Sequence, residues 1–239
     1  MTWLWLTSFS VLTTVSLAGD LVSGHVLLSE SRLSAVRKRL DYSGVVVWLE
    51  PVGPPNTADS APRPGHTRME QKEKRFVPHI LAIQAGTSVS FPNSDPIFHS
   101  AFSNFSGQTF DLGLYAPGTS RTIAFDRPGV VRVFCNIHPE MTAVIVVLKQ
   151  PWFAVSNAAG AFSIPGVPPG TYRLRVFHER ATAQTLGALD REIDLSSDVA
   201  LPPIAISETG YIEVPHKDKY GQEYPPVPDD HGGYPMGRK

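Results

Sequence analysis

Cysteine is almost absent from this sequence, since Cys135 is the only one among 239 residues. No disulfide can form within the chain, and zinc sites built from paired cysteines are excluded for the same reason. The chain also lacks a charge bias, because 21 Lys and Arg residues balance 22 Asp and Glu residues. Without a basic field, a nucleic-acid partner is not expected. No Ser–His–Asp arrangement, phosphate-binding loop or catalytic pair of carboxylates is visible, so the sequence does not suggest an enzyme.

Glycine and proline are abundant, with 19 and 22 residues. This content is typical of short strands joined by tight turns. Runs rich in valine and aromatic residues recur between the turn residues, which predicts an all-β protein. The expected strands are residues 21–28, 44–50, 76–83, 88–91, 109–112, 120–125, 130–134, 142–148, 153–155, 161–164, 171–177 and 204–206.

The N-terminus reads as a signal peptide over residues 1–18. Residues 3–15 are mostly apolar, and Ser16 and Ala18 are small residues at the positions that signal peptidase reads. The apolar run is shorter than the ~20 residues needed to span a bilayer. We therefore expect a periplasmic or secreted protein with no membrane span after cleavage. Because residues 1–15 contain no Lys or Arg, an uncleaved N-terminal anchor remains the alternative.

The residues that carry chemistry lie in Cys135-Asn136-Ile137-His138-Pro139-Glu140-Met141, directly after a valine-rich strand. Thiolate, imidazole and thioether groups suit both Cu(I) and Cu(II), and two His, one Cys and a distant Met form the trigonal site used for electron transfer. His99 lies upstream, after the predicted turn at residues 93–96. We predict one copper site formed by His99, Cys135, His138 and Met141. Glu140 offers a carboxylate as an alternative axial ligand.

The remaining histidines are not expected to be ligands. The nearest rival is His79, in a predicted strand, where a structural or surface role is expected. The others are His25, His66, His178, His216 and His231.

With these residues in place, the sequence resembles the cupredoxins, the small blue copper electron carriers. The loop is most similar to that of amicyanin, whose C-x-x-H-P-x-M pattern is matched by Cys135, His138, Pro139 and Met141. The resemblance implies a Greek-key β-sandwich over residues 75–149. It also implies outer-sphere transfer of single electrons between redox partners, with His138 as the residue through which the electron leaves the protein. One departure is Ser100, which stands where cupredoxins usually carry an asparagine that bonds across to the cysteine loop.

A second resemblance covers residues 151–206. The turns at residues 157–162 and 168–172 are similar to those of the carboxypeptidase regulatory-like, or carbohydrate-binding-like, β-sandwich. Carbohydrate is the partner that this resemblance implies, although no aromatic platform for a sugar accompanies it. The combination resembles exported bacterial proteins labelled methylamine utilisation protein.

These features predict a domain order. Residues 20–50 provide the first strands of the regulatory-like sandwich, residues 51–74 form a Pro-rich linker, and the cupredoxin domain of residues 75–149 is inserted before residues 151–206. Residues 207–239 form a disordered tail. The alternative assigns residues 20–50 to the cupredoxin. The alternative function is a binding or scaffold protein whose copper site is vestigial or serves in delivery.

Overall fold

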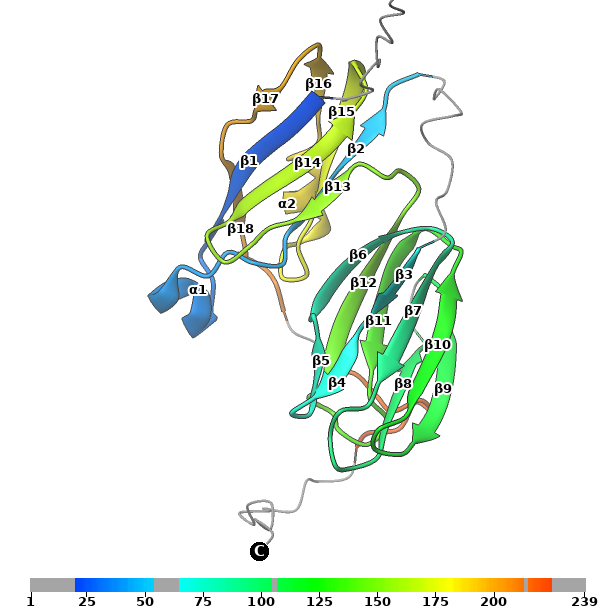
Figure 1. Ribbon diagram of the computed structural model, residues 1–239. Coiled ribbons are helices and arrows are strands. Elements are labelled where there is room, and N and C mark those ends of the chain that lie inside the picture. The colour runs from blue at the N-terminus through cyan, green and yellow to red at the C-terminus, as the bar shows by residue number, and fades with distance from the viewer. Residues whose placement is uncertain (1–19, 54–64, 105–106, 213–214, 225–239) are drawn as a thin grey trace, which may run out of the picture.

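The computed structural model describes residues 20–53, 65–104, 107–212 and 215–224, and strands dominate it (Figure 1). The predicted all-β class, with two β-sandwiches, is confirmed. The signal peptide expected over residues 1–18 lies outside the described residues. Within the described ranges, no helix is long and apolar enough to cross a membrane.

One sandwich, here called the first sandwich, combines strands from both ends of the chain. Its first sheet joins β1 (Asp20–Ser29) to β14 (Ala161–Val167), β17 (Val199–Ala200) and β18 (Ile204–Ser207). Its second sheet has the order β13 (Phe153–Val155), β2 (Val46–Pro51), β15 (Gly170–Phe177), β16 (Arg191–Leu195). Alternate residues of β1 and β15 face inward, and the core includes Val22, Val26, Leu49, Ile164, Leu174 and Ile204. Two short helices, α1 (Ser34–Arg39) and α2 (Ala183–Gly187), lie in the connections.

The pairing of β2 decides how the chain is divided. Val47 lies opposite Ala154 on β13 and opposite Val176 on β15. Among the described residues, β2 pairs with no strand between residues 66 and 148. The chain therefore leaves the first sandwich after β2 and returns to it at β13.

The strands between these two points form a second unit, here called the inserted sandwich. A five-stranded sheet has the order β6 (Ile80–Gln84), β12 (Thr142–Leu148), β11 (Gly129–Phe134), β8 (His99–Ser103), β9 (Phe110–Tyr115). The other sheet joins β10 (Ser120–Phe125), β7 (Thr87–Pro92) and β3 (His66–Arg68), and β4 (Glu70–Lys72) pairs with β5 (Arg75–Val77). The two sheets enclose a core that includes Val89, Phe91, Phe125, Val133 and Ile145.

The linker and one predicted strand differ from what the sequence predicted. The Pro-rich linker was expected to extend to residue 74, but β3 and β4 lie within it and Met69 and Gln71 are fully buried. The end of this stretch is part of the inserted sandwich, because Met69 packs into its core. The single strand expected over residues 76–83 is divided into β5 and β6 around Pro78, whose nitrogen cannot donate to a strand ladder.

Strand β12 of the inserted sandwich lies between its core and the first sandwich and packs against both. Its run of apolar residues is buried on both faces. Ile145 faces the core of the inserted sandwich, whereas Val144 and Val146 belong to a separate buried cluster with Val46 of β2. A strand covered on both sides is expected to read as a continuous hydrophobic run rather than an alternating one.

Candidate metal centre

Three neighbouring strands bring the predicted ligands to one end of the inserted sandwich. His99 is the first residue of β8, Cys135 directly follows β11, and Met141 directly precedes β12. Because β11 pairs with both β8 and β12, the loop of residues 135–141, here called the ligand loop, lies beside the start of β8.

The side chains of His99, Cys135 and His138 converge. The Nδ1 atoms of the two histidines lie 3.1 Å apart, and the Cys135 Sγ lies 3.9 Å from His99 Nδ1 and 3.7 Å from His138 Nδ1. The one sulfur and two nitrogen atoms all lie within 4.8 Å of one another. One thiolate and two imidazoles form the donor set of trigonal copper sites, so the residues fit a copper ion.

Met141 and Glu140 differ in their exposure. Met141 is 1% exposed and belongs to the same buried cluster as Cys135, whereas Glu140 is exposed. The Met141 N–H donates to the His138 carbonyl, and the Cys135 N–H donates to the Met141 carbonyl, which closes the loop into a tight turn. The backbone thus places the thioether on the inner side of the loop and the carboxylate on the outer side.

Asp95 is a site residue that the sequence analysis treated only as part of a turn. Its Oδ2 lies 2.8 Å from His99 Nε2, and its carboxylate also accepts the backbone N–H groups of Glu73 and Lys74. Burial, the largest influence, raises the pKa of Asp95, but these hydrogen bonds outweigh it and hold the pKa below its usual value. A fixed carboxylate on the outer nitrogen orients the imidazole so that Nδ1 faces the site.

The Cys135 thiol is fully buried yet acidic. Burial raises the pKa of the Cys135 thiol. Hydrogen bonds with the His138 and His99 side chains, and with the backbone at Ser100 and Ile137, outweigh burial and lower the pKa to about 5. The pKa of His99 is raised, because its contacts with Cys135 and Asp95 outweigh the effect of burial. Within the site, Ser100 Oγ lies 3.7 Å from the Cys135 sulfur and accepts the Asn136 N–H.

None of the other described histidines belongs to this donor set. His79 has two partners, since its Nε2 lies 2.8 Å from Glu179 Oε2 and its Nδ1 lies 2.9 Å from the Thr142 carbonyl oxygen. His178 is buried against Glu208. His231 lies outside the described residues.

Comparisons with known proteins give partial similarities. No protein-family model and no curated protein matches the chain. A Cu-containing nitrite reductase from Thermus scotoductus SA-01 is 27% identical over 41% of this chain and 25% of its own, with a TM-score of 0.34. This chain therefore spans about a quarter of the length of that protein.

Two smaller proteins are covered almost completely. A purple cupredoxin from Nitrosopumilus maritimus is 21% identical over 34% of this chain and 99% of its own, with a TM-score of 0.32. Amicyanin from Paracoccus versutus is 19% identical over 43% of this chain and 97% of its own, with a TM-score of 0.33.

Proposed function

We propose that this chain is an exported type 1 copper protein that transfers single electrons between redox partners by an outer-sphere mechanism. The observation that carries the proposal is the convergence of His99, Cys135 and His138 from two separate parts of the chain. Bound copper would supply the exchange between Cu(I) and Cu(II).

The protein's own part is to hold the donor atoms in place. His99 is fixed by Asp95, and the Cys135 sulfur is fixed by Ser100 and by the main-chain bonds of the ligand loop. With a pKa of about 5, the Cys135 side chain is a thiolate at neutral pH before any metal arrives. Such a pre-arranged donor set limits rearrangement when an electron enters or leaves.

His138 is the proposed exit for the electron. It is partly exposed, and its neighbour Ile137 is 45% exposed. Phe98, next to His99, is 51% exposed. These apolar side chains provide a dry surface against which a redox partner can dock. Phe102, three residues after His99, is 1% exposed and belongs to the interior.

Copper loading tests the proposal directly. Purified protein with Cu(II) should develop a strong thiolate-to-copper absorption near ~600 nm, as expected of a His₂Cys site. Cys135→Ala should abolish the band, because no other thiol is present. Glu140→Gln is the matched control on the same loop and should leave the band unchanged, since Glu140 faces outward. A colourless protein that releases copper readily would overturn the electron carrier and favour the delivery or scaffold function.

A further inference from the structure

Residues 215–224, here called the strap, lie across the outer side of the ligand loop, at the end of the inserted sandwich seen at the bottom of Figure 1. The sequence predicted a disordered tail over these residues. The strap contains no helix or strand, but hydrogen bonds to other parts of the chain hold it in place. The Tyr224 hydroxyl donates to the Cys135 carbonyl over 3.0 Å, and the Lys219 N–H donates to Asn136 Oδ1 over 2.9 Å. His216 Nε2 donates to the Pro139 carbonyl over 2.7 Å. All these acceptors belong to the ligand loop.

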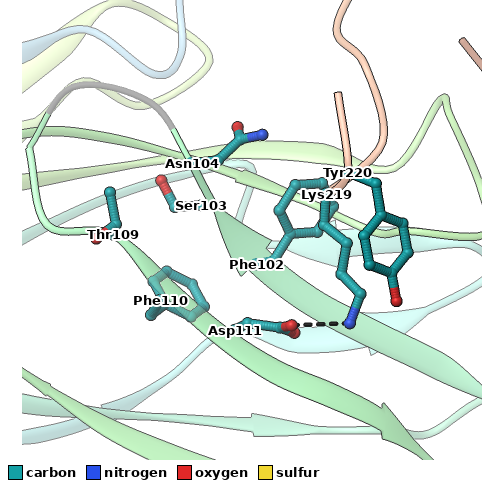
Figure 2. A pocket seen from close by; sticks show the side chains of 8 residues that line it. All are labelled: Phe102, Ser103, Asn104, Thr109, Phe110, Asp111, Lys219 and Tyr220. Carbon is teal, nitrogen blue, oxygen red and sulfur yellow. Dashed lines mark hydrogen bonds and ion pairs between the residues drawn. The ribbon is translucent and has the colours of Figure 1, made fainter. Parts of the chain in front are cut away.

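Two further contacts tie the strap to the five-stranded sheet next to the loop. The His216 ring stacks on Phe134 at the end of β11, with ring centres 4.1 Å apart. The Lys219 ammonium pairs with the Asp111 carboxylate on β9 (Figure 2), and the two groups lie 2.8 Å apart. The strap is thus anchored to the sheet and hydrogen-bonded to the ligand loop.

The peptide group between Cys135 and Asn136 is held at both of its ends. Its N–H donates to Ser100 Oγ over 2.8 Å on the inner side, and its carbonyl accepts the Tyr224 hydroxyl on the outer side. Because this peptide leaves the Cα of Cys135, its orientation sets the direction in which the thiolate points. Ser100 therefore holds the N–H side of this peptide group, and Tyr224 holds its carbonyl side.

We propose that the strap is a built-in clamp that positions Cys135 and His138 for the metal, with Tyr224 as its main positioning residue. The inference rests on the proposed copper function. Groups that orient metal ligands from outside typically change metal affinity by about 10-fold to 100-fold when removed. A single neutral hydrogen bond belongs at the lower end of that range.

Tyr224→Phe, which removes only the hydroxyl, tests the clamp against Tyr220→Phe. Tyr220 lies on the same strap but is 72% exposed, so it provides a matched change away from the loop. In Tyr224→Phe we expect copper release to a chelator to accelerate about tenfold. We also expect the thiolate-to-copper band to shift, and amide hydrogen exchange of residues 136–141 to rise in the metal-free protein. Tyr220→Phe should behave as the unaltered protein in all three measurements.

His216→Phe provides a second route to the same answer. This change keeps a ring to stack on Phe134 but removes the donor to Pro139, so it should also raise exchange in the ligand loop. If Tyr224→Phe does not fold, hydrogen exchange in the ligand loop of His216→Phe tests the clamp instead.

The outcomes separate the two proposals. If the unaltered protein takes up no copper, the proposed function fails, while hydrogen exchange on the metal-free protein still judges the clamp. If copper binds but exchange, release and spectrum are the same in Tyr224→Phe as in Tyr220→Phe, the clamp is overturned and the copper function stands.

Discussion

Nε2 of His99 lies 2.8 Å from Oδ2 of Asp95, and both side chains are buried, with 0% and 6% exposed. The carboxylate occupies the outer nitrogen of the ring, so the inner nitrogen, Nδ1, is left facing Cys135 and His138. Asp95 is itself held by the N–H groups of Glu73 and Lys74, which lie in a turn between β4 and β5. The orientation of one proposed metal ligand therefore depends on a turn distant from it in the sequence.

Asp95→Asn should weaken copper binding. The asparagine oxygen can accept a hydrogen bond from the His99 ring or from the backbone N–H groups of the turn, but not from both sides. Its NH₂ group then faces a donor on the remaining side, so the His99 ring loses its fixed orientation. We expect a loss of affinity of about 10-fold to 100-fold, measured by competition with a chelator of known affinity. Asp126→Asn, at an exposed carboxylate, serves as the control. Equal affinities in the two variants would contradict the role given to Asp95.

The convergence of His99, Cys135 and His138 could be predicted from the sequence because most of the proposed donor set is local. Cys135, His138 and Met141 share one short loop, and the soft donors in this spacing indicate copper without any knowledge of the fold. Asp95 was missed because an aspartate in the sequence Asn93-Ser94-Asp95-Pro96 is explained equally well by a turn. Only the placement of the turn between β4 and β5 beside the loop that joins β7 to β8 distinguishes the two roles.

The strap was missed for a related reason. Tyr224 contacts Cys135 across 89 residues of sequence, and the segment between residues 215 and 224 has neither the period of a strand nor that of a helix. Its order comes from bonds to another part of the chain, which composition alone does not reveal. In contrast, β1, β2, β12 and β15 follow from continuous or alternating apolar residues, which are buried in the cores of the two sandwiches and in the cluster between them.

In the metal-free protein, the Cys135 thiol should titrate with a midpoint near pH 5, the value to which its pKa is lowered. A free thiol titrates at about 8.5. Because the folded pKa is the lower one, the thiolate contributes stability that is fully present above the unfolded value and is lost as the pH falls toward 5. Thiolate absorbance near ~240 nm follows the titration, and Cys135→Ser supplies the baseline. A midpoint near that of a free thiol would mean that the histidines do not contact the sulfur.

The pair of His79 and Glu179 links the two sandwiches and should make their stability depend on pH. Burial lowers the pKa of His79, but the hydrogen bond and charge of Glu179 outweigh it, and the net pKa is raised. The charged imidazole therefore contributes stability that is fully present below the unfolded pKa, about 6.5, and is lost as the pH rises through the folded value.

His79→Gln should accordingly lower the thermal unfolding temperature more at pH 6 than at pH 8.5. Scanning calorimetry at several pH values measures the difference from the unaltered protein. His25→Gln is the control, because His25 is exposed on β1. A constant difference across this pH range would show that the pair does not stabilise the folded chain through charge.

Gly160 lies where the first sandwich tolerates no side chain, and Gly160→Ala should destabilise it. Gly160 has a φ of 81°, and a Cβ there would lie 2.2 Å from the carbonyl oxygen of Val26 on β1. Gly166 also has a positive φ, of 71°, but a Cβ there would meet nothing within 4 Å. Gly166→Ala therefore carries only the backbone cost of about 1–2 kcal/mol, whereas Gly160→Ala must also displace β1, whose Val26 N–H donates to the Gly160 carbonyl. Among the described residues, the tryptophans Trp48 and Trp152 both lie in the first sandwich, so fluorescence during denaturant unfolding reports on this unit.

We expect the free energy of unfolding to fall by at least ~2 kcal/mol more in Gly160→Ala than in Gly166→Ala. The absorption of the copper-loaded site in the inserted sandwich should be the same in both variants. Equal losses in the two variants would mean that β1 does not pass as close to this turn as the structure places it.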